Sequence, residues 1–353
     1  MGHQLTIEPL GETIEVEDGQ TMLDACLRAG IYLPYACGHG LCGTCKVDVV
    51  DGEVDHADAS GFALMDFERS EGKTLACSAR LLSNVTIEAD IDEEPDQRRI
   101  AVQDFIGRVA ILEDLTHDVK GVRLVLEGET LDFQAGQYVN LTLPGVHGSR
   151  AFSIANPPTE GGHVDLQIRR VPGGQGTAYI HETLKLGDQL KLSGPYGRFF
   201  VRESRGGPLL FMAGGTGVSS PRAMILDLLG KGYAEPITLI HGVRTRADLY
   251  GEAEFIALAD KHPNFRYVTG LSSEPEGSDW AGERGFVHEV ADRLFGGLFE
   301  GWSAYLCGPP PMIDACLNTL IRGRLFEKHI FTERFLTAKD GTEKHKSPLF
   351  KKI

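Results

Sequence analysis

Four cysteines stand at the spacing that an iron-sulfur cluster requires. Cys37, Cys42 and Cys45 follow the pattern C-x4-C-x2-C, and Cys77 comes after 31 intervening residues. A plant-type 2Fe-2S cluster takes its four thiolate ligands at this spacing. The short loop must curl around the inorganic core, so that sulfurs close in sequence reach the irons from different directions. The pattern therefore predicts a 2Fe-2S cluster with these four cysteines as its metal ligands.

Three glycines, Gly38, Gly40 and Gly43, interleave these thiols. Glycine allows positive φ, and it brings backbone N–H groups close to the sulfurs. Two other uses of the thiols stay open at this point. A zinc site more often shows two C-x2-C pairs, and a disulfide framework favours an even cysteine count in a short secreted chain. The spacing favours the cluster over both.

Two glycine-rich stretches could hold phosphate groups. Residues 214–217 (GGTG) join a predicted buried strand to a helix, with Ser220 as its predicted N-cap and Pro221 at the first helical position. Residues 173–177 (GGQGT) open a shorter predicted helix over 177–184. Backbone N–H groups and the helix dipole bind pyrophosphate at such N-termini. The GGTG loop is incomplete as a dinucleotide fingerprint, because G-x-G-x-x-G and an acidic ribose partner are both missing.

Two further motifs carry groups that suit a nucleotide cofactor. Residues 150–153 (RAFS) combine a guanidinium for phosphate, an aromatic ring for stacking and a hydroxyl for a ring nitrogen. Residues 307–312 (CGPPPM) follow a later predicted strand, at the edge where ligands gather in open α/β sheets. Alternatively, RAFS is an ordinary strand and the proline run a rigid turn.

The charge of the chain is concentrated at its N-terminal end. The net charge is −15, and residues 1–97 account for all of it with 20 acidic and 5 basic side chains. Such polarity argues against nucleic acid or an anionic membrane as partner, and it suits either docking to a basic protein surface or solubility. The N-terminus shows no apolar signal core, so we expect a cytoplasmic protein.

The predicted elements fall into three blocks. The first is α+β, with strands over 3–8, 12–17, 46–50 and 85–89 and a helix over 21–29 that buries Cys26. The second contains short strands typical of an antiparallel barrel, and the third alternates strand and helix, ends in a strand over 329–335 and buries Cys316. The predicted boundaries are 1–95, a linker over 96–102, 103–203, 204–340 and a basic mobile tail over 341–353, with the tail already polar from residue 338.

In this order the motifs resemble the reductase components of bacterial multicomponent monooxygenases, within the ferredoxin-NADP reductase superfamily. The likeness is closest to the phenol hydroxylase reductase component, and YACGHGLCGTCKVDVVDGEVD, FQAGQYVNLTLPG and LSGPYGRFFVR carry much of it. It implies a multidomain fold: a β-grasp 2Fe-2S ferredoxin domain, an antiparallel β-barrel FAD domain and a Rossmann-like α/β NAD(P) domain. It also implies electron flow from NADH through FAD and the cluster to the di-iron hydroxylase of a phenol/toluene-type monooxygenase.

The resemblance assigns cofactor-binding roles to Arg150, Ala151, Phe152, Ser153, Ile168, Arg169, Gly174, Thr177, Gly215, Thr216, Gly217, Cys307, Gly308, Pro309 and Phe335. Arg150 would pair with the FAD pyrophosphate, Phe152 would stack on the isoalloxazine ring and Ser153 would bond near flavin N5. Many superfamily members carry Tyr at the position of Phe152, so a hydroxyl contact to the flavin is lost here.

The remaining roles divide between the two nucleotides. Ile168 and Arg169 would line the adenine-phosphate side of FAD, with Gly174 and Thr177 on its pyrophosphate. The nicotinamide nucleotide would be held by Gly215, Thr216, Cys307, Gly308 and Pro309. Ser153, Cys307 and Glu333 would form the catalytic hydride-transfer site, and Phe335 would shield the flavin.

Several alternatives remain open from the sequence. NADH is the preferred donor, but Arg244 and Arg246 follow the second strand of the α/β block, where they could meet the 2′-phosphate of NADPH. The same cofactor set would serve the reductase of a Rieske-type dioxygenase or of a deoxysugar dehydratase. A zinc-stabilised scaffold or a nucleotide-sensing module is the non-enzyme alternative.

Overall fold

The computed structural model describes residues 2–36, 38, 40–91 and 94–335. The chain forms two compact units, Met1–Gln103 and Asp104–Ile353. The predicted mobile tail lies outside the described residues. None of the helices in the described ranges combines the length and hydrophobicity that a bilayer crossing needs.

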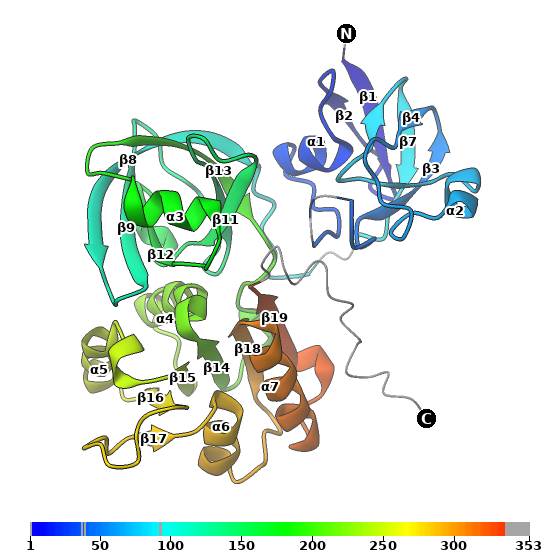
Figure 1. Cartoon of the computed structure of the whole chain (residues 1–353). Helices are drawn as coiled ribbons and strands as arrows, with labels where there is room; N and C mark the ends of the chain where they lie inside the picture. Colours follow the sequence, from blue (N-terminus) through cyan, green and yellow to red (C-terminus); the bar gives the residue numbers. More distant parts are fainter. Residues whose placement is uncertain (1, 37, 39, 92–93, 336–353) are drawn as a thin grey trace. The chain divides into compact units, whose positions relative to one another are not determined.

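The first unit is built on one five-stranded sheet with the order β2-β1-β7-β3-β5 (Figure 1). Its strands are β1 (His3–Glu8), β2 (Glu12–Val16), β3 (Lys46–Asp51), β5 (Lys73–Leu75) and β7 (Val85–Glu88). β1 pairs with β7 in parallel, and the other pairs are antiparallel. A small second sheet pairs β4 (Val54–Asp55) with β6 (Arg80–Leu81). The predicted hairpin of β1 and β2 is confirmed.

Two helices complete this unit. The first, α1 (Met22–Arg28), is capped by the Thr21 hydroxyl, and its buried side includes Cys26, as its apolar periodicity predicts. The second, α2 (Asp66–Ser70), is a single short turn beside β5 that the sequence analysis did not identify. Its five residues are too few to give a helical repeat.

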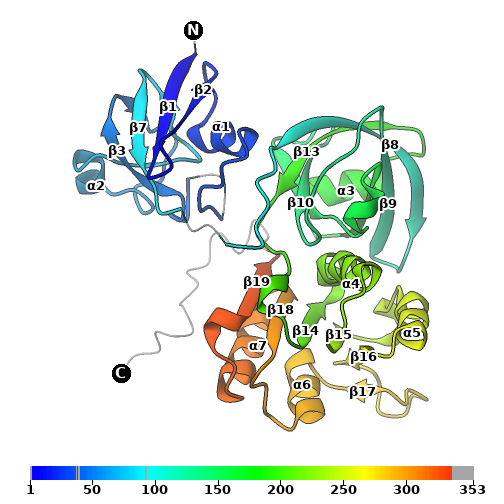
Figure 2. The same ribbon diagram turned by 180° about the vertical axis from the view of Figure 1, so that it is seen from behind.

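The second unit begins with an antiparallel six-stranded sheet of the order β11-β10-β13-β8-β9-β12, which is barrel-like (Figure 2). Its strands are β8 (Gln103–Asp114), β9 (Val119–Leu126), β10 (Tyr138–Thr142), β11 (Ser149–Ser153), β12 (His163–Arg169) and β13 (Gln189–Tyr196). Alternate side chains of these strands fill one apolar core.

The short helix of the barrel, α3 (Gln175–Glu182), begins two residues before the predicted start at 177. The Thr177 hydroxyl accepts from the Val171 N–H at 3.0 Å and lies 3.2 Å from the Gly174 carbonyl oxygen. Because the Thr177 side chain is hydrogen-bonded to the preceding turn, the chain already has helical geometry at Gln175. The prediction of a helix is confirmed, and its predicted bounds are wrong by two residues at each end.

The rest of the second unit is a parallel sheet of the order β17-β16-β15-β14-β18-β19. Its strands are β14 (Leu209–Gly214), β15 (Ile237–Val243), β16 (Phe265–Leu271), β17 (Glu283–Arg284), β18 (Ser303–Gly308) and β19 (Ile330–Arg334). Its helices are α4 (Ser219–Lys231), α5 (Glu252–Lys261), α6 (Val287–Phe295) and α7 (Pro310–Arg322). The last strand is one residue shorter at each end than the predicted 329–335.

The two faces of this parallel sheet have separate cores. One core joins α4 and α5 to the sheet and includes Phe199 and Val201 from the end of the barrel. The other lies under α6 and α7 and buries Cys316, as predicted. Because the first core takes side chains from both sheets, the barrel and the α/β sheet form one compact unit. In both views α4 lies between them (Figures 1 and 2).

The predicted cap of α4 is wrong. The helix begins at Ser219, directly after the 3-10 turn η3 (Gly215–Val218), and Val218 occupies the N-cap position without a side-chain hydrogen bond. Ser220 is therefore inside the first helical turn, since the GGTG loop continues into the helix without an extended residue. Its hydroxyl is free to bond elsewhere.

Candidate functional site

Three of the four predicted cluster ligands lie in the described part of the first unit. Cys42 is exposed, Cys45 and Cys77 are buried, and none of these three described cysteines forms a disulfide; Cys37 lies outside the described residues. The Gly40 N–H donates to the Cys77 sulfur at 3.1 Å. Gly40 has φ +74°, and a Cβ there would lie 2.6 Å from the Ser78 hydroxyl oxygen. The loop therefore needs glycine at this position, as the sequence predicts.

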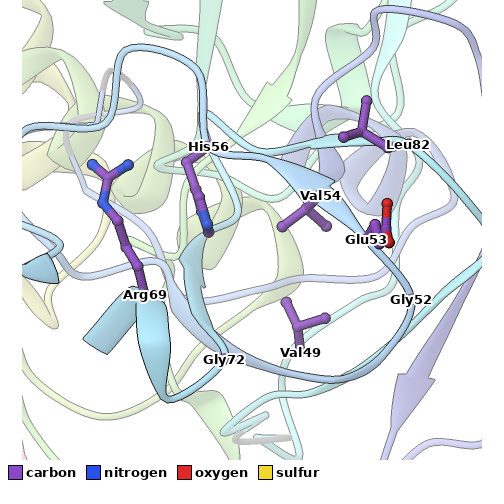
Figure 3. Close-up of a pocket in the computed structure, with 8 residues that line it drawn as sticks. All are labelled: Val49, Gly52, Glu53, Val54, His56, Arg69, Gly72 and Leu82. Carbon is purple, nitrogen blue, oxygen red and sulfur yellow. The ribbon is translucent and has the colours of Figure 1, made fainter. Parts of the chain in front are cut away.

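The segment that follows β4 supports this loop. The Ser60 N–H donates to the Gly40 carbonyl at 3.0 Å, and the Arg69 guanidinium donates to the Ala59 carbonyl at 2.9 Å. Arg69 also borders a shallow pocket of about 360 Å³. This pocket is lined by Val49, Gly52, Glu53, Val54, His56, Arg69, Gly72 and Leu82 (Figure 3). It contains none of the predicted site residues.

His56 lies beside Arg69 in this pocket (Figure 3). Burial, and then the Arg69 charge, lower the pKa of His56. Its Nδ1 lies 2.8 Å from the hydroxyl oxygen of buried Thr74. Arg69 is already bonded to Ala59, so we interpret this pair as support for the segment under the cysteine loop.

In the barrel, Arg150 and the start of α3 lie together. The Arg150 guanidinium donates to the carbonyls of His147 and Ser149 at 3.0 and 2.9 Å. A Cβ on Gly176 would lie only 2.9 Å from Arg150 Cγ, so the side chain crosses the first turn of α3. A cationic side chain beside a helix N-terminus suits a pyrophosphate. Gly174, the N-cap of α3, belongs to the same turn.

The neighbouring residues of the RAFS motif lie on β11. Ala151 is exposed, and Phe152 is half-buried against the barrel core. β11 pairs with β10, which brings Ser153 opposite Tyr138. Tyr138 stacks on Tyr196 with 5.6 Å between ring centroids. The sequence analysis missed this aromatic pair, because its two members come from different strands and belong to no local motif.

Ile168 and Arg169 differ in their burial and in their contacts. The Ile168 side chain is buried in the barrel core, and its carbonyl lies 3.0 Å from His181 Nε2. Arg169 is partly exposed and donates from Nε to Asp118 at 2.7 Å. Its Nη1 lies 3.5 Å from the point where a Cβ of Gly215 would stand. The guanidinium of Arg169 therefore faces the GGTG loop.

The GGTG loop and the CGPPPM loop touch at the edge of the parallel sheet. A Cβ on Gly217 would lie 2.2 Å from the Cys307 carbonyl oxygen, and a Cβ on Gly214 would lie 2.5 Å from Met312 Sδ. Gly308 has φ +149°, a conformation that favours glycine. Gly215, Thr216 and Pro309 thus lie where the two loops meet, at the carboxyl ends of β14 and β18, the edge at which dinucleotides bind in such sheets.

The Glu333 side chain lies between the barrel and the α/β sheet. Its Oε2 lies 3.5 Å from the Ser153 hydroxyl, 2.9 Å from the Ser220 hydroxyl and 3.7 Å from the Cys307 sulfur. Burial raises the pKa of Glu333 to about 7, and the three donors oppose this rise. Burial and the nearby carboxylate raise the pKa of Cys307, so its thiol stays protonated at neutral pH.

The structure therefore brings the three predicted catalytic residues, Ser153, Cys307 and Glu333, to one point. It adds Ser220, which the sequence analysis assigned to a helix cap. The paired serines before Pro221 are the only local signal, and they do not reveal a partner 113 residues away. Phe335, the last described residue, donates its N–H to the Gly308 carbonyl at 2.9 Å, which places its backbone beside the CGPPPM loop.

These residues fit the three expected groups by their chemistry. The cysteine loop offers thiols and a backbone N–H directed at sulfur, which suits an iron-sulfur cluster. The barrel offers a guanidinium and a helix N-terminus for a diphosphate, with a half-buried aromatic nearby. The GGTG and CGPPPM loops leave no room for a Cβ at Gly214 or Gly217, so the two loops pack closely at the carboxyl ends of β14 and β18, the edge where nucleotides bind in such sheets.

Family models match each of these regions. Residues 5–82 match a 2Fe-2S iron-sulfur cluster binding domain, residues 107–201 an oxidoreductase FAD-binding domain, and residues 211–318 an oxidoreductase NAD-binding domain. The chain is accordingly an NADH oxidoreductase that uses FAD and a 2Fe-2S cluster.

Curated relatives match over the full length. The chain is 56% identical to the reductase component of phenol 2-monooxygenase from Pseudomonas sp. strain CF600, and 52% identical to the phenol hydroxylase P5 protein of Acinetobacter pittii strain PHEA-2. Each alignment covers 100% of both chains.

Solved structures agree with this assignment. The Amycolatopsis reductase GcoB superposes with a TM-score of 0.85 at 36% identity, over 94% of this chain and 98% of that one. The ferredoxin reductase of carbazole 1,9a-dioxygenase gives 0.76 at 29% identity, over 95% and 99%. The chain belongs to the family of reductase components of bacterial multicomponent monooxygenases, within the ferredoxin-NADP reductase superfamily.

Proposed function

We propose that this protein supplies electrons from NADH to the di-iron hydroxylase of a phenol/toluene-type multicomponent monooxygenase, in the cytoplasm of a bacterium that degrades aromatic hydrocarbons. The observation that carries the proposal is the convergence of the Ser153 hydroxyl and the Cys307 sulfur on the Glu333 carboxyl oxygen, between the barrel and the parallel sheet. The relatives of highest identity reported above are the reductase component of a phenol 2-monooxygenase and a phenol hydroxylase P5 protein, which supports the choice of acceptor.

The bound groups would supply the redox chemistry: FAD would take a hydride from NADH, and the cluster would carry the electrons onward one at a time. The protein's residues bind and orient. Arg150 and the α3 N-terminus would hold the FAD pyrophosphate, and Phe152 would stack against the flavin. Ser153 would hydrogen-bond at flavin N5, while protonated Cys307 and Glu333 would border the nicotinamide.

The structure suggests a refinement for two residues. Because Arg169 faces the Gly215 loop, we assign its guanidinium to the phosphates of the nicotinamide nucleotide and not to the adenine side of FAD. Because Thr177 is bonded to Val171 and Gly174, its hydroxyl shapes the turn that presents backbone N–H groups to the FAD pyrophosphate. Arg169 is thus reassigned from FAD to the nicotinamide nucleotide, whereas Thr177 keeps its predicted place at the FAD pyrophosphate.

NADH is the proposed donor. Arg246 follows β15, and its backbone N–H donates to the Glu274 carboxylate at 3.0 Å. A carboxylate at this edge repels a 2′-phosphate, whereas a ribose hydroxyl can donate to it. Turnover measured with each nucleotide tests the assignment, and equal or better use of NADPH would contradict it.

The variant Cys42→Ser tests the order of electron carriers. It removes one cluster ligand from an exposed position, so we expect NADH to reduce the flavin at the normal rate while reduction of the di-iron hydroxylase is lost. Cys26→Ala is the matched control, because it removes a buried thiol of the same unit that is no ligand. Stopped-flow absorbance separates flavin from cluster reduction, and loss of both in Cys42→Ser would mean that the proposed order is wrong.

A second acceptor class deserves a direct comparison. The naphthalene 1,2-dioxygenase/salicylate 5-hydroxylase reductase component of Ralstonia sp. is 33% identical over 94% of this chain. We therefore keep Rieske-type dioxygenases as the alternative acceptor. Reconstitution with each purified oxygenase discriminates, because product should form only with the true partner.

A further inference from the structure

Helix α4 opens with two buried serines whose hydroxyls have different partners. Ser219 Oγ lies 2.8 Å from Gln167 Oε1 and 2.9 Å from the Thr216 carbonyl oxygen. Ser220 Oγ donates instead to Glu333 Oε2 at 2.9 Å. A serine hydroxyl inside a helix commonly bonds back to a carbonyl of the preceding turn, as Ser219 does. Ser220 reaches a side chain of the last strand.

The contact from Ser220 is the shortest of the three on this carboxyl oxygen. Ser153 lies 3.5 Å away and the Cys307 sulfur 3.7 Å away. An O–H···O hydrogen bond is strong near 2.7–2.8 Å and weakens with distance. The Ser220 bond is therefore the principal restraint on the carboxyl among the described residues. A buried hydroxyl and a buried carboxyl also each need a partner, so the bond stabilises both.

We propose that Ser220 is a positioning residue that fixes the Glu333 carboxyl toward Ser153 and Cys307. The inference rests on the proposed function, because it assigns a role within the same hydride-transfer site. Ser220 reaches the site through the first turn of α4, while Ser153 arrives from β11 and Cys307 from β18. Ser220 thus connects α4 to Glu333, which lies between the two sheets.

The protonation of Glu333 gives this role a measurable signature. Burial raises the pKa of Glu333 to about 7, and the Ser220 hydrogen bond is the largest influence that lowers it. A donor stabilises the charged carboxylate, so loss of the donor raises the pKa further. Among the described groups that face this carboxyl, only Cys307 also titrates, and burial raises the pKa of that thiol well above its usual value.

The first test measures this carboxyl directly in the flavin-free full-length protein. Infrared difference spectra against Glu333→Gln isolate the protonated carboxyl signal, and its midpoint is followed with pH. In Ser220→Ala we expect the midpoint to rise by about one pH unit, which corresponds to loss of one charge-assisted hydrogen bond. Ser220→Thr keeps a hydroxyl and should restore the wild-type midpoint. Ser219→Ala, one residue away, should leave the midpoint unchanged.

The second test uses the enzyme loaded with both cofactors. Positioning should affect the rate of flavin reduction at saturating NADH more than NADH binding. We therefore expect Ser220→Ala to lower that rate by about tenfold, with the Kd for NADH changed less than about twofold. The inflection of the rate with pH should move upward together with the infrared midpoint. Ser220→Cys, a near-isosteric variant with a weak donor, should give an intermediate result if Ser220→Ala folds poorly.

Two outcomes would overturn the inference. One is an infrared midpoint in Ser220→Ala that equals the wild-type value, since the serine would then be only a packed core residue. The other is a larger loss of NADH affinity than of reduction rate, because the hydroxyl would then serve nucleotide binding. If the loaded wild-type protein is not reduced by NADH, the proposed function fails, whereas the infrared result still decides the Ser220–Glu333 link.

Discussion

The environment of Glu333 determines its pKa. Its carboxyl lies where β18 and β19 are paired, directly opposite Cys307 in register. Burial raises its pKa from 4.5 to about 7, so the folded protein holds this proton where the unfolded chain has lost it. The stabilising contribution of this proton is therefore lost as the pH rises from about 4.5 toward 7.

Gly217 gives a prediction at the same scale. A Cβ there would lie 2.2 Å from the Cys307 carbonyl oxygen and 2.9 Å from the Gly308 Cα. Both are backbone atoms, so one loop must move. We expect Gly217→Ala to destabilise the protein by about 2 kcal/mol and to weaken NADH binding. Thermal unfolding and isothermal titration with NADH measure the two effects.

Gly230 supplies the matched control for this prediction. It is exposed in the last turn of α4, and nothing lies within 4 Å of the position of its Cβ. Gly230→Ala should therefore be neutral or should stabilise the helix by up to about 1 kcal/mol. If the two alanine variants unfold at the same temperature and bind NADH equally, the close packing of the two loops is wrong.

At the scale of elements, α4 connects the two halves of the second unit. Its Arg222 donates to both carboxylate oxygens of Glu254 on α5 at 2.7 and 2.6 Å, and to the Ala155 carbonyl after β11 at 2.6 Å. Ser220 in the same helix reaches β19. A helix bonded to three other elements restrains the distance between the barrel and the nucleotide loops.

The loops after β15 and β16 contain the residues on which the predicted preference for NADH over NADPH depends. The Glu274 carboxylate accepts from the Arg246 backbone N–H, and the Arg246 guanidinium lies 3.5 Å from Asp279. Glu274→Gln removes the negative charge that repels a 2′-phosphate. The Arg246 guanidinium is then available to bind that phosphate. We expect the KM for NADPH to fall by about tenfold, while that for NADH changes little. Steady-state kinetics with both nucleotides measure this.

Glu276→Gln is the control for Glu274→Gln, because it removes an exposed charge two residues away. It should leave the ratio of NADPH to NADH use unchanged. If both variants shift the ratio equally, the effect comes from general charge and not from the Glu274 contact.

At the scale of the whole molecule, the negative charge is concentrated in the N-terminal part of the chain. Residues 1–97 carry a net charge of −15, and residues 98–353 have none. Electrostatic steering of the acidic unit toward a basic surface on the hydroxylase would depend on ionic strength. We expect the second-order rate of hydroxylase reduction to fall by about tenfold or more between 0.05 and 0.5 M salt.

Internal electron transfer provides the control for this salt dependence. NADH reduction of the flavin and cluster, observed without hydroxylase, should change by less than about twofold over the same range, because no second protein has to bind. A hydroxylase reduction rate that is independent of salt would instead assign the negative charge to solubility.

Most elements could be predicted from the sequence because they depend on local patterns. Alternating apolar residues identified β1 and β2, and the periodicity of α1 placed Cys26 in a core. The errors in the predicted helix ends occur where a side-chain hydrogen bond, which the local pattern does not reveal, is involved. Thr177 bonds backward, so α3 begins at Gln175, and Ser220 bonds to Glu333, so it is no cap. The domain boundaries and the assigned ligand roles stay predictions.

The sequence by itself predicted the 2Fe-2S cluster and the order of the three structural blocks, because thiol spacing and strand-helix alternation are local features, while FAD and NADH were implied by the family resemblance. The tertiary structure alone decided which residues share a site. Ser153 and Glu333 are 180 residues apart, and Ser220 and Glu333 are 113 apart. Contacts over such distances depend on how β11, α4 and β19 pack, and no pattern within one segment contains that information.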